Sequence, residues 1–185
     1  AMAHTYAVSH GPEGLKRIAS RVHSFARKLS EGAQALGFAP FNAHYFDTVS
    51  CNSPVDVSAV RKAMEARGIN LTYGAKSITI ALDETVREQD VNDVLAGLAE
   101  ASGKKASPVT SSNGIPTNVP SALQRTSAFL THPIFNTHHT ETELMRYLKR
   151  LENKDFSLTH GMIPLGSCTM KLNAAATLMP LTWPE

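Results

Sequence analysis

The most extended hydrophobic pattern in the chain predicts a long amphipathic helix. Apolar residues recur at helical spacing over 15–36, after a Gly11-Pro12 start and before Gly37, which suits the backbone turn at a helix end. His23 lies beside the apolar stripe of this helix. We interpret it as a packed or half-exposed side chain rather than a metal ligand or a base.

Shorter patterns predict the rest of a small α+β unit. Aromatic and β-branched residues over 43–51 and 69–72, and strict alternation over 77–82, are typical of strands. Two more helices are predicted, a short one capped by Asp56 and another with apolar residues at helical spacing over 91–98. The order helix, strand, helix, strand, strand, helix favours a small open sheet with helices on one face, in the α/β (α+β) class.

The composition changes after this unit. Ser, Gly, Lys, Pro, Thr and Asn dominate residues 101–118, which is typical of a linker, and we place a boundary there. Further on, residues 140–143 read Thr-Glu-Thr-Glu, a capping box that begins another helix. The apolar face expected for that helix consists of Leu144, Tyr147, Leu148 and Leu151. Basic residues gather toward its C-terminal end: Lys149, Arg150 and Lys154.

The stretch that follows combines residues that packing alone does not need. It reads His160-Gly-Met-Ile-Pro-Leu-Gly-Ser-Cys-Thr-Met-Lys-Leu-Asn173. Its candidate site residues are Ser167, Cys168, Thr169, Lys171 and Asn173. Hydroxyls, an amide and a cation on a turning backbone suit the binding of a phosphate or carboxylate. The same residue types also form ordinary tight turns, and from chemistry alone that is their commoner use.

Composition and charge exclude several classes of function. The chain has 185 residues, of which 42% are hydrophobic and 18% charged, so a buried core is expected. A net charge of +2 is too small for a nucleic-acid surface, and no apolar run reaches membrane-spanning length. The two cysteines, Cys51 and Cys168, form neither a disulfide framework nor a zinc spacing, which fits a reducing compartment.

A metal site near residue 138 is the weaker of two interpretations. His138 and His139 stand close to Glu141 and Glu143, but the spacing matches no zinc pattern. Both acids already have a role at the start of a helix. We therefore expect no bound metal.

Several segments resemble one enzyme family, glycine dehydrogenase (decarboxylating), the P-protein of the glycine cleavage system. The segments are Tyr6-Ala-Val, His10-Gly-Pro-Glu-Gly-Leu-Lys-Arg-Ile-Ala19, Phe46-Asp-Thr, Leu82-Asp-Glu-Thr-Val86, Phe129-Leu-Thr-His-Pro-Ile-Phe-Asn136, residues 141–155 and residues 162–173. They span nearly the whole chain, and the 162–173 motif is highly specific to the family. The linker is the poorest match.

The resemblance implies that this chain is a fragment of a longer protein. Family members resemble two fused halves of the fold-type-I pyridoxal-phosphate architecture, of which only the C-terminal half holds the cofactor. Residues 1–101 then correspond to the last long helix and the small α+β domain of the N-terminal half. Residues 102–120 are a linker, and residues 121–185 are the connector and the helical or extended opening of the C-terminal half. The apolar residues near the end, such as Trp183, fit this expectation because they need cover.

The resemblance also implies the chemistry. The intact oxidoreductase uses pyridoxal 5'-phosphate to decarboxylate glycine and passes the aminomethyl group to the lipoyl group of the H-protein. The Schiff-base lysine is expected downstream of Glu185, so Lys171 is not a substitute for it, and the fragment alone is expected to be inactive and free of cofactor. The loop of Ser167, Cys168 and Thr169, with Lys171 and Asn173, is expected near the substrate or cofactor. The intact enzyme is expected to be dimeric, and cytoplasmic in bacteria or mitochondrial in eukaryotes.

Two other functions fit the residues taken alone. One is a free-standing α+β module that binds a metabolite or a protein, because such sheets serve many unrelated functions. The other is a small enzyme with Cys168 as nucleophile, which requires a neighbouring base that sequence cannot place. We interpret Cys168 as a packed or loop residue instead.

Overall fold

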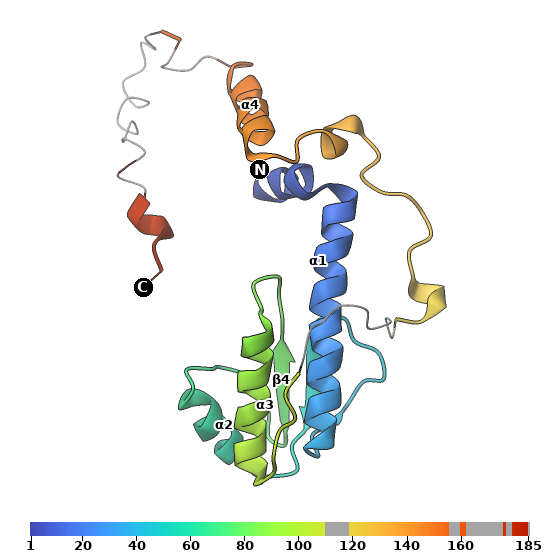
Figure 1. Cartoon of the computed structure of the whole chain (residues 1–185), viewed down its shortest axis with the longest axis vertical. Coiled ribbons are helices and arrows are strands. Elements are labelled where there is room, and N and C mark those ends of the chain that lie inside the picture. Colours follow the sequence, from blue (N-terminus) through green and yellow to red (C-terminus); the bar gives the residue numbers. More distant parts are fainter. Residues whose placement is uncertain (110–118, 156–159, 162–175, 177–178, 185) are drawn as a thin grey trace.

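A four-stranded antiparallel sheet lies under three helices in the first part of the chain (Figure 1). The structure is a computed structural model, and it describes residues 1–109, 119–155, 160–161, 176 and 179–184. The strands follow the order β1-β2-β4-β3 and are β1 (Ala39–Pro40), β2 (Thr48–Asn52), β3 (Thr72–Tyr73) and β4 (Ser77–Ala81). The helices on the sheet are α1 (Met2–Ala35), α2 (Val57–Glu65) and α3 (Glu88–Ser102). The predicted small open sheet with helices on one face is confirmed.

The core lies between the two central strands and the helices. Val49 of β2 pairs with Ile80 of β4, and Cys51 pairs with Ile78, and these side chains are buried while their strand neighbours are not. The strict alternation predicted for 77–82 therefore marks the buried face of β4. The helices contribute their largest fully buried side chains to the same cluster: Leu29, Met64, Leu95 and Leu98.

Two predicted strands begin later than expected. The strand predicted over 43–51 begins at Thr48, because the carbonyl of Phe46 accepts a hydrogen bond from Nδ1 of His23 at 2.8 Å instead of joining the sheet. The strand predicted over 69–72 is Thr72–Tyr73, because the N–H of Ile69 donates to the carbonyl of Met64 at the end of α2. His23 itself is buried and stacks on Phe46, as expected for a packed histidine.

The long helix begins earlier than predicted, with a kink. Gly11 has φ 61° and ψ 179°, which separates a first segment from the helix that starts at Pro12. The predicted start at Gly11-Pro12 is therefore the start of the second segment, and the helical turns before Gly11 were not predicted. The predicted end is confirmed: the helix stops at Leu36, and Gly37 has φ 96°.

The connector leaves the sheet after α3 and returns to the kinked end of α1 (Figure 1). Gly103, with φ 67°, ends α3, and the side chain of Asn92 accepts from the N–H of Val109 at 2.7 Å. Residues 110–118 lie outside the described residues, and the described residues beyond them include three short elements and one helix. They are η1 (Ser121–Leu123), η2 (Pro133–Asn136), α4 (Glu141–Glu152) and η3 (Met179–Thr182).

Candidate functional site

The five loop residues predicted to bind an anion lie outside the described residues. They are Ser167, Cys168, Thr169, Lys171 and Asn173. The structure describes the element that precedes this loop in the chain, α4, and the surface on which α4 rests. Anion binding by the loop therefore stays a prediction. The structure shows how α4, the helix before the loop, is held in place.

The predicted capping box sets the start of α4. The hydroxyl of Thr140 accepts from the N–H of Glu143 at 3.3 Å, and the carboxylate of Glu143 accepts from the N–H of Thr140 at 3.3 Å. The carboxylate also accepts from the hydroxyl of Thr140 at 3.0 Å, and this bond is the largest cause of a lowered pKa of Glu143. Glu143 thus caps α4 as an ionised carboxylate. Within the described ranges, no group of three His, Cys, Asp or Glu side chains is placed to hold a metal ion.

Helix α4 rests on the kinked end of α1 through Tyr147. Among the 12 residues of α4, Tyr147 alone is buried. Its hydroxyl lies 3.0 Å from Nε2 of His4, and its ring stacks on His138 with centroids 4.8 Å apart and an interplanar angle of 13°. His4 also meets Phe135 edge-on, with centroids 5.8 Å apart. We call this contact region the joint, and it consists of His4, Ser9, Gly11, Phe135, His138, His139, Tyr147 and Arg150.

Arg150 fixes the tautomer of His138, the buried histidine of the joint. Nη2 of Arg150 lies 3.1 Å from Nε2 of His138, which is 9% exposed. A guanidinium has only donors, so Nε2 of His138 accepts and the ring proton of the neutral form lies on Nδ1. Arg150 therefore orients the ring that stacks on Tyr147. This arrangement gives His138 a structural use and leaves no free Nε2 for catalysis.

The second contact of the joint is at the kink. Nδ1 of His139 donates to the carbonyl of Ser9 at 3.0 Å. A Cβ added to Gly11 would lie 2.6 Å from Cε1 of His139 and 2.7 Å from the carbonyl oxygen of Phe135. Sequence reasoning missed these contacts, since it considered His138 and His139 only as metal ligands. No local signal pairs residues 4–11 with residues more than a hundred positions away.

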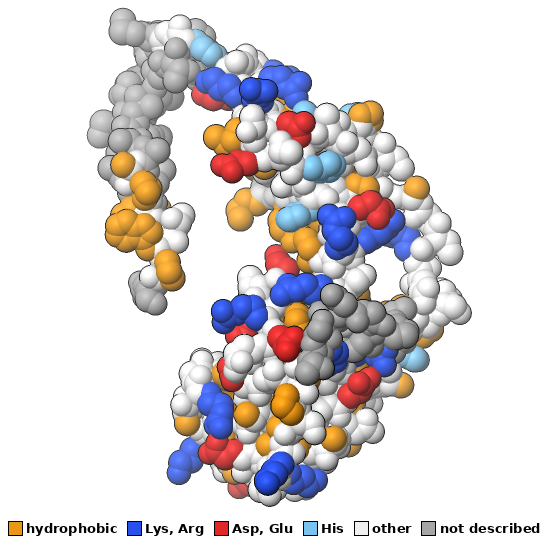
Figure 2. Space-filling view, viewed as in Figure 1, with side chains coloured by type: hydrophobic (Ala, Val, Ile, Leu, Met, Phe, Trp, Pro, Cys, Tyr) orange, Lys and Arg blue, Asp and Glu red, His pale blue; other side chains and the backbone are white. Residues whose placement is uncertain are grey.

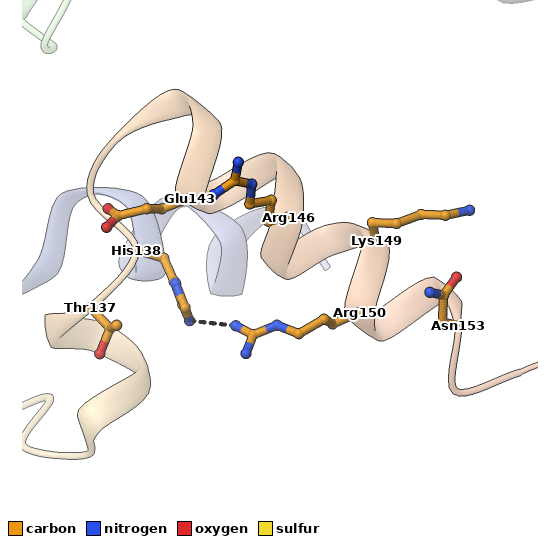
Figure 3. A pocket seen from close by; sticks show the side chains of 7 residues that line it. All are labelled: Thr137, His138, Glu143, Arg146, Lys149, Arg150 and Asn153. Atoms are coloured by element: carbon orange, nitrogen blue, oxygen red, sulfur yellow. Dashed lines mark hydrogen bonds between the residues drawn. The ribbon is translucent and has the colours of Figure 1, made fainter.

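An open hollow on α4 gathers positive charge (Figure 3). Its volume is about 470 Å³, and it is lined by Thr137, His138, Glu143, Arg146, Lys149, Arg150 and Asn153. Arg150 reaches across it toward His138, while Lys149 pairs with Glu152 at 3.0 Å. Such a surface attracts anions weakly, because exposed charges are well screened. Its lining combines three cations with one carboxylate, so its charge is positive.

The cysteine of the described residues, Cys51, is a buried residue of the core. Its side chain is fully buried in β2, and burial raises the pKa of the thiol to about 11. Cys168 lies outside the described residues. The Lys residues of the described ranges are all exposed except the half-buried Lys28. No helix in this described portion is both long and apolar enough to cross a membrane.

Comparison with known proteins assigns the chain to a family. A family model described as "Glycine cleavage system P-protein" matches residues 1–98. Glycine dehydrogenase (decarboxylating) of Aliivibrio salmonicida is 50% identical over 188 residues, which cover 100% of this chain and 19% of that relative. The enzymes of the same name from Vibrio cholerae and Flavobacterium johnsoniae are 47% identical, again over 100% of this chain and 19% of their own length. This chain thus spans about a fifth of the length of these relatives.

One solved structure is also similar. It is a crystal structure of glycine decarboxylase (P-protein) of the glycine cleavage system in inhibitor-bound form. The similarity covers 52% of this chain and 24% of that chain, with 29% sequence identity and a TM-score of 0.46.

Proposed function

The chain belongs to the glycine cleavage system P-protein family, and on that premise we propose that it is a segment of an enzyme that decarboxylates glycine with pyridoxal 5'-phosphate. The observation that carries the proposal is the 50% identity to a glycine dehydrogenase (decarboxylating) over 100% of this chain. Because the chain spans only 19% of that relative, the activity belongs to the longer protein. Alone, the segment is expected to be inactive.

We propose that the chain consists of three parts of the longer protein. Residues 1–101 are the last long helix and the small α+β domain of the N-terminal half. Residues 102–120 are the linker, and residues 121–185 are the connector and the opening of the cofactor-binding half. Two observations support this division: α3 ends at Ser102, and residues 135–150 return to the kink of α1 and meet it in the joint. The joint would hold α4, and with it the start of the following loop, at a fixed place on the small domain.

The loop residues would bind an anionic group of the substrate or cofactor. Hydroxyls of Ser167 and Thr169 suit a carboxylate or phosphate oxygen, and Lys171 adds positive charge. Cys168 and Asn173 would complete the loop. When bound, pyridoxal phosphate supplies the electron sink that decarboxylation requires. From the family resemblance, the lysine that holds it is expected in the part of the family protein beyond Glu185 and not at Lys171.

The partners follow from the same family. The aminomethyl group is expected to pass to the lipoyl group of the H-protein, and the intact enzyme is expected to be a dimer. The relatives named above are bacterial, which supports the bacterial cytoplasm over the mitochondrion as the place of action. These assignments concern the longer protein rather than this segment.

A chimera tests the proposal. This chain would replace the stretch that it matches in the A. salmonicida relative, and the product would be assayed for glycine-dependent exchange of carbon dioxide and for the colour of the bound cofactor. We expect exchange and colour in the chimera and neither in this chain alone. A folded chimera without exchange, or colour in the short chain, would contradict the proposal.

The loop has its own test in the same chimera. Replacing Ser167 and Thr169 with Ala should weaken the binding of glycine or cofactor by about tenfold or more, as expected when charge-assisted hydrogen bonds are lost. Thr131→Ala, at an exposed position of the connector, is the matched control, and it should change neither the binding of glycine nor the binding of the cofactor. Unchanged affinities and rate in the double variant would refute the role of the loop but not the family function.

A further inference from the structure

Helix α4 carries an apolar face that the described part of the chain leaves partly exposed. Leu144, Met145, Leu148 and Leu151 lie on one side of the helix, at spacings of one, three and four residues. Met145 is 62% exposed, Leu148 38% and Leu151 39%, whereas Tyr147 faces the joint. Figure 2 shows hydrophobic side chains exposed along this flank of α4. We call these four residues the outer stripe.

The outer stripe is more than scattered surface residues. It belongs to a helix of 12 residues, and helices of that length are marginal in water unless an apolar face is packed. The joint packs Tyr147, but it leaves Met145 largely exposed and leaves Leu148 and Leu151 more than a third exposed. Apolar side chains grouped in this way on one flank of a helix make a candidate interaction site when a partner is at hand to cover them.

The area of the stripe decides what kind of partner it fits. Four side chains offer at most a few hundred Å², whereas a stable complex of separate proteins buries about 1,200–2,000 Å² in total. A second copy of this chain would therefore not be held by the stripe alone. A segment of the same polypeptide needs no such area, because covalent linkage gives it an effective concentration on the order of millimolar.

We propose that the outer stripe is the docking surface for the polypeptide that follows this chain in the longer family protein. This inference rests on the proposed function, in which α4 opens the cofactor-binding half. In that proposal the cofactor-binding half continues beyond α4, and a longer protein is at hand because this chain accounts for only 19% of the length of the relative. The docking would clamp α4 between the joint on one side and the downstream part on the other, so the loop after α4 starts from a helix held on both faces.

Cysteine labelling tests the docking directly. Leu148→Cys would be placed in this chain and in the chimera with the A. salmonicida relative, and its alkylation rate would be followed by mass spectrometry of the peptide. We expect labelling to be at least tenfold slower in the chimera. Arg146→Cys is the matched control, since it lies two residues away and on the opposite side of the helix, and its rate should be similar in both proteins.

Each outcome decides the inference. The inference is overturned if Leu148→Cys is labelled at the same rate in the chimera and in the short chain, or if labelling slows equally at Leu148→Cys and Arg146→Cys. It is also overturned if Leu148→Cys is protected in the short chain and loses that protection on dilution, because a second copy would then be the occupant. If Leu148→Cys prevents folding of the chimera, amide exchange of residues 141–152 in the unsubstituted chimera and short chain gives the same comparison, and equal exchange overturns the inference. Carbon dioxide exchange tests the proposed function separately. A chimera that is active but in which Leu148→Cys is labelled as fast as in the short chain would refute the docking and leave the proposed function standing.

Discussion

Gly11 and His139 touch at the kink of α1, and the contact leaves no room for a side chain on Gly11. A Cβ there would lie 2.6 Å from Cε1 of His139, closer than real Cβ contacts allow. The backbone of Gly11 also has φ 61° and ψ 179°, a region that is essentially restricted to glycine. The kink and the return of the connector therefore depend on the same residue.

Gly11→Ala should open the joint. Both the backbone strain and the contact with His139 oppose the substitution, so the joint should lose about 3 kcal/mol of stability. Amide exchange in residues 2–10 and 133–150 should rise by about two orders of magnitude, since each factor of ten is 1.4 kcal/mol. Exchange in β2 and β4 should stay unchanged, because their core lies elsewhere.

A second glycine provides the control for that prediction. Gly68 also has a positive φ, 69°, but a Cβ added there would meet nothing within 4 Å. Gly68→Ala should therefore show only the backbone cost of about 1 kcal/mol, felt at the end of α2 and not in the joint. If both variants leave the joint intact, the contact between Gly11 and His139 does not hold it.

The small sheet and its helices could be predicted from the sequence because their signals are local. The alternation in β4, the cap at Asp56 and the stop at Gly37 each depend on neighbours within a few residues. The ends of β2 and β3 could not be predicted, since contacts from His23 and from the end of α2 compete for their backbone groups.

The joint lay beyond sequence reasoning for a different reason. Tyr147 was predicted to lie on the apolar face of its helix, but nothing local shows that His4 would be its partner, 143 positions away. His138 and His139 suggested a metal site because the sequence of a histidine pair does not show whether it binds zinc, stacks on a tyrosine or donates to a carbonyl. Only the structure shows which of these roles each histidine has.

Tyr147 should carry most of the binding energy of α4 to the joint. Tyr147→Ala removes a ring that is 7% exposed and stacked on His138, and should cost about 3 kcal/mol in the stability of the joint. Tyr147→Phe removes only the hydrogen bond with His4 and should cost about 1 kcal/mol. Amide exchange of residues 141–152 measures both.

The neighbouring Met145 serves as the comparison for Tyr147. It is 62% exposed, so Met145→Ala should change the exchange of α4 in this chain by less than about threefold, as is usual for surface substitutions. An effect of Met145→Ala as large as that of Tyr147→Ala would show that α4 packs through its other face.

The cap of α4 should be sensitive to pH. The pKa of Glu143 is lowered chiefly by the hydrogen bond from the side chain of Thr140, then by the bond from its backbone N–H. A carboxylate whose folded pKa is depressed contributes stability that is present above its unfolded pKa and lost as pH falls through the folded pKa. Acidification should therefore fray the first turn of α4 in the wild-type chain and have no such effect in Glu143→Gln.

Substitution of Thr140 tests the cause of that shift. Thr140→Ala should raise the pKa of Glu143 toward its ordinary value, seen in an NMR titration of the carboxyl carbon, and should weaken α4 by about 1 kcal/mol through loss of the cap. Thr142→Ala, at an exposed position of the same turn, should leave the titration where it is. A Glu143 titration that does not move in Thr140→Ala would assign the shift to another group.

Cys51 should report the opening of the sheet rather than react in the folded state. Burial raises the pKa of its thiol from 9.0 to about 11, which at pH 8 lowers the thiolate fraction about 100-fold. Since the folded pKa is raised, this thiol costs no stability below its unfolded pKa, and stability is lost as pH rises from there through about 11. In a Cys168→Ser background, alkylation of Cys51 at pH 8 should follow the unfolding curve in urea, measured in parallel by circular dichroism. Labelling at the rate of a free thiol without denaturant would show that β2 is not the buried central strand of the sheet.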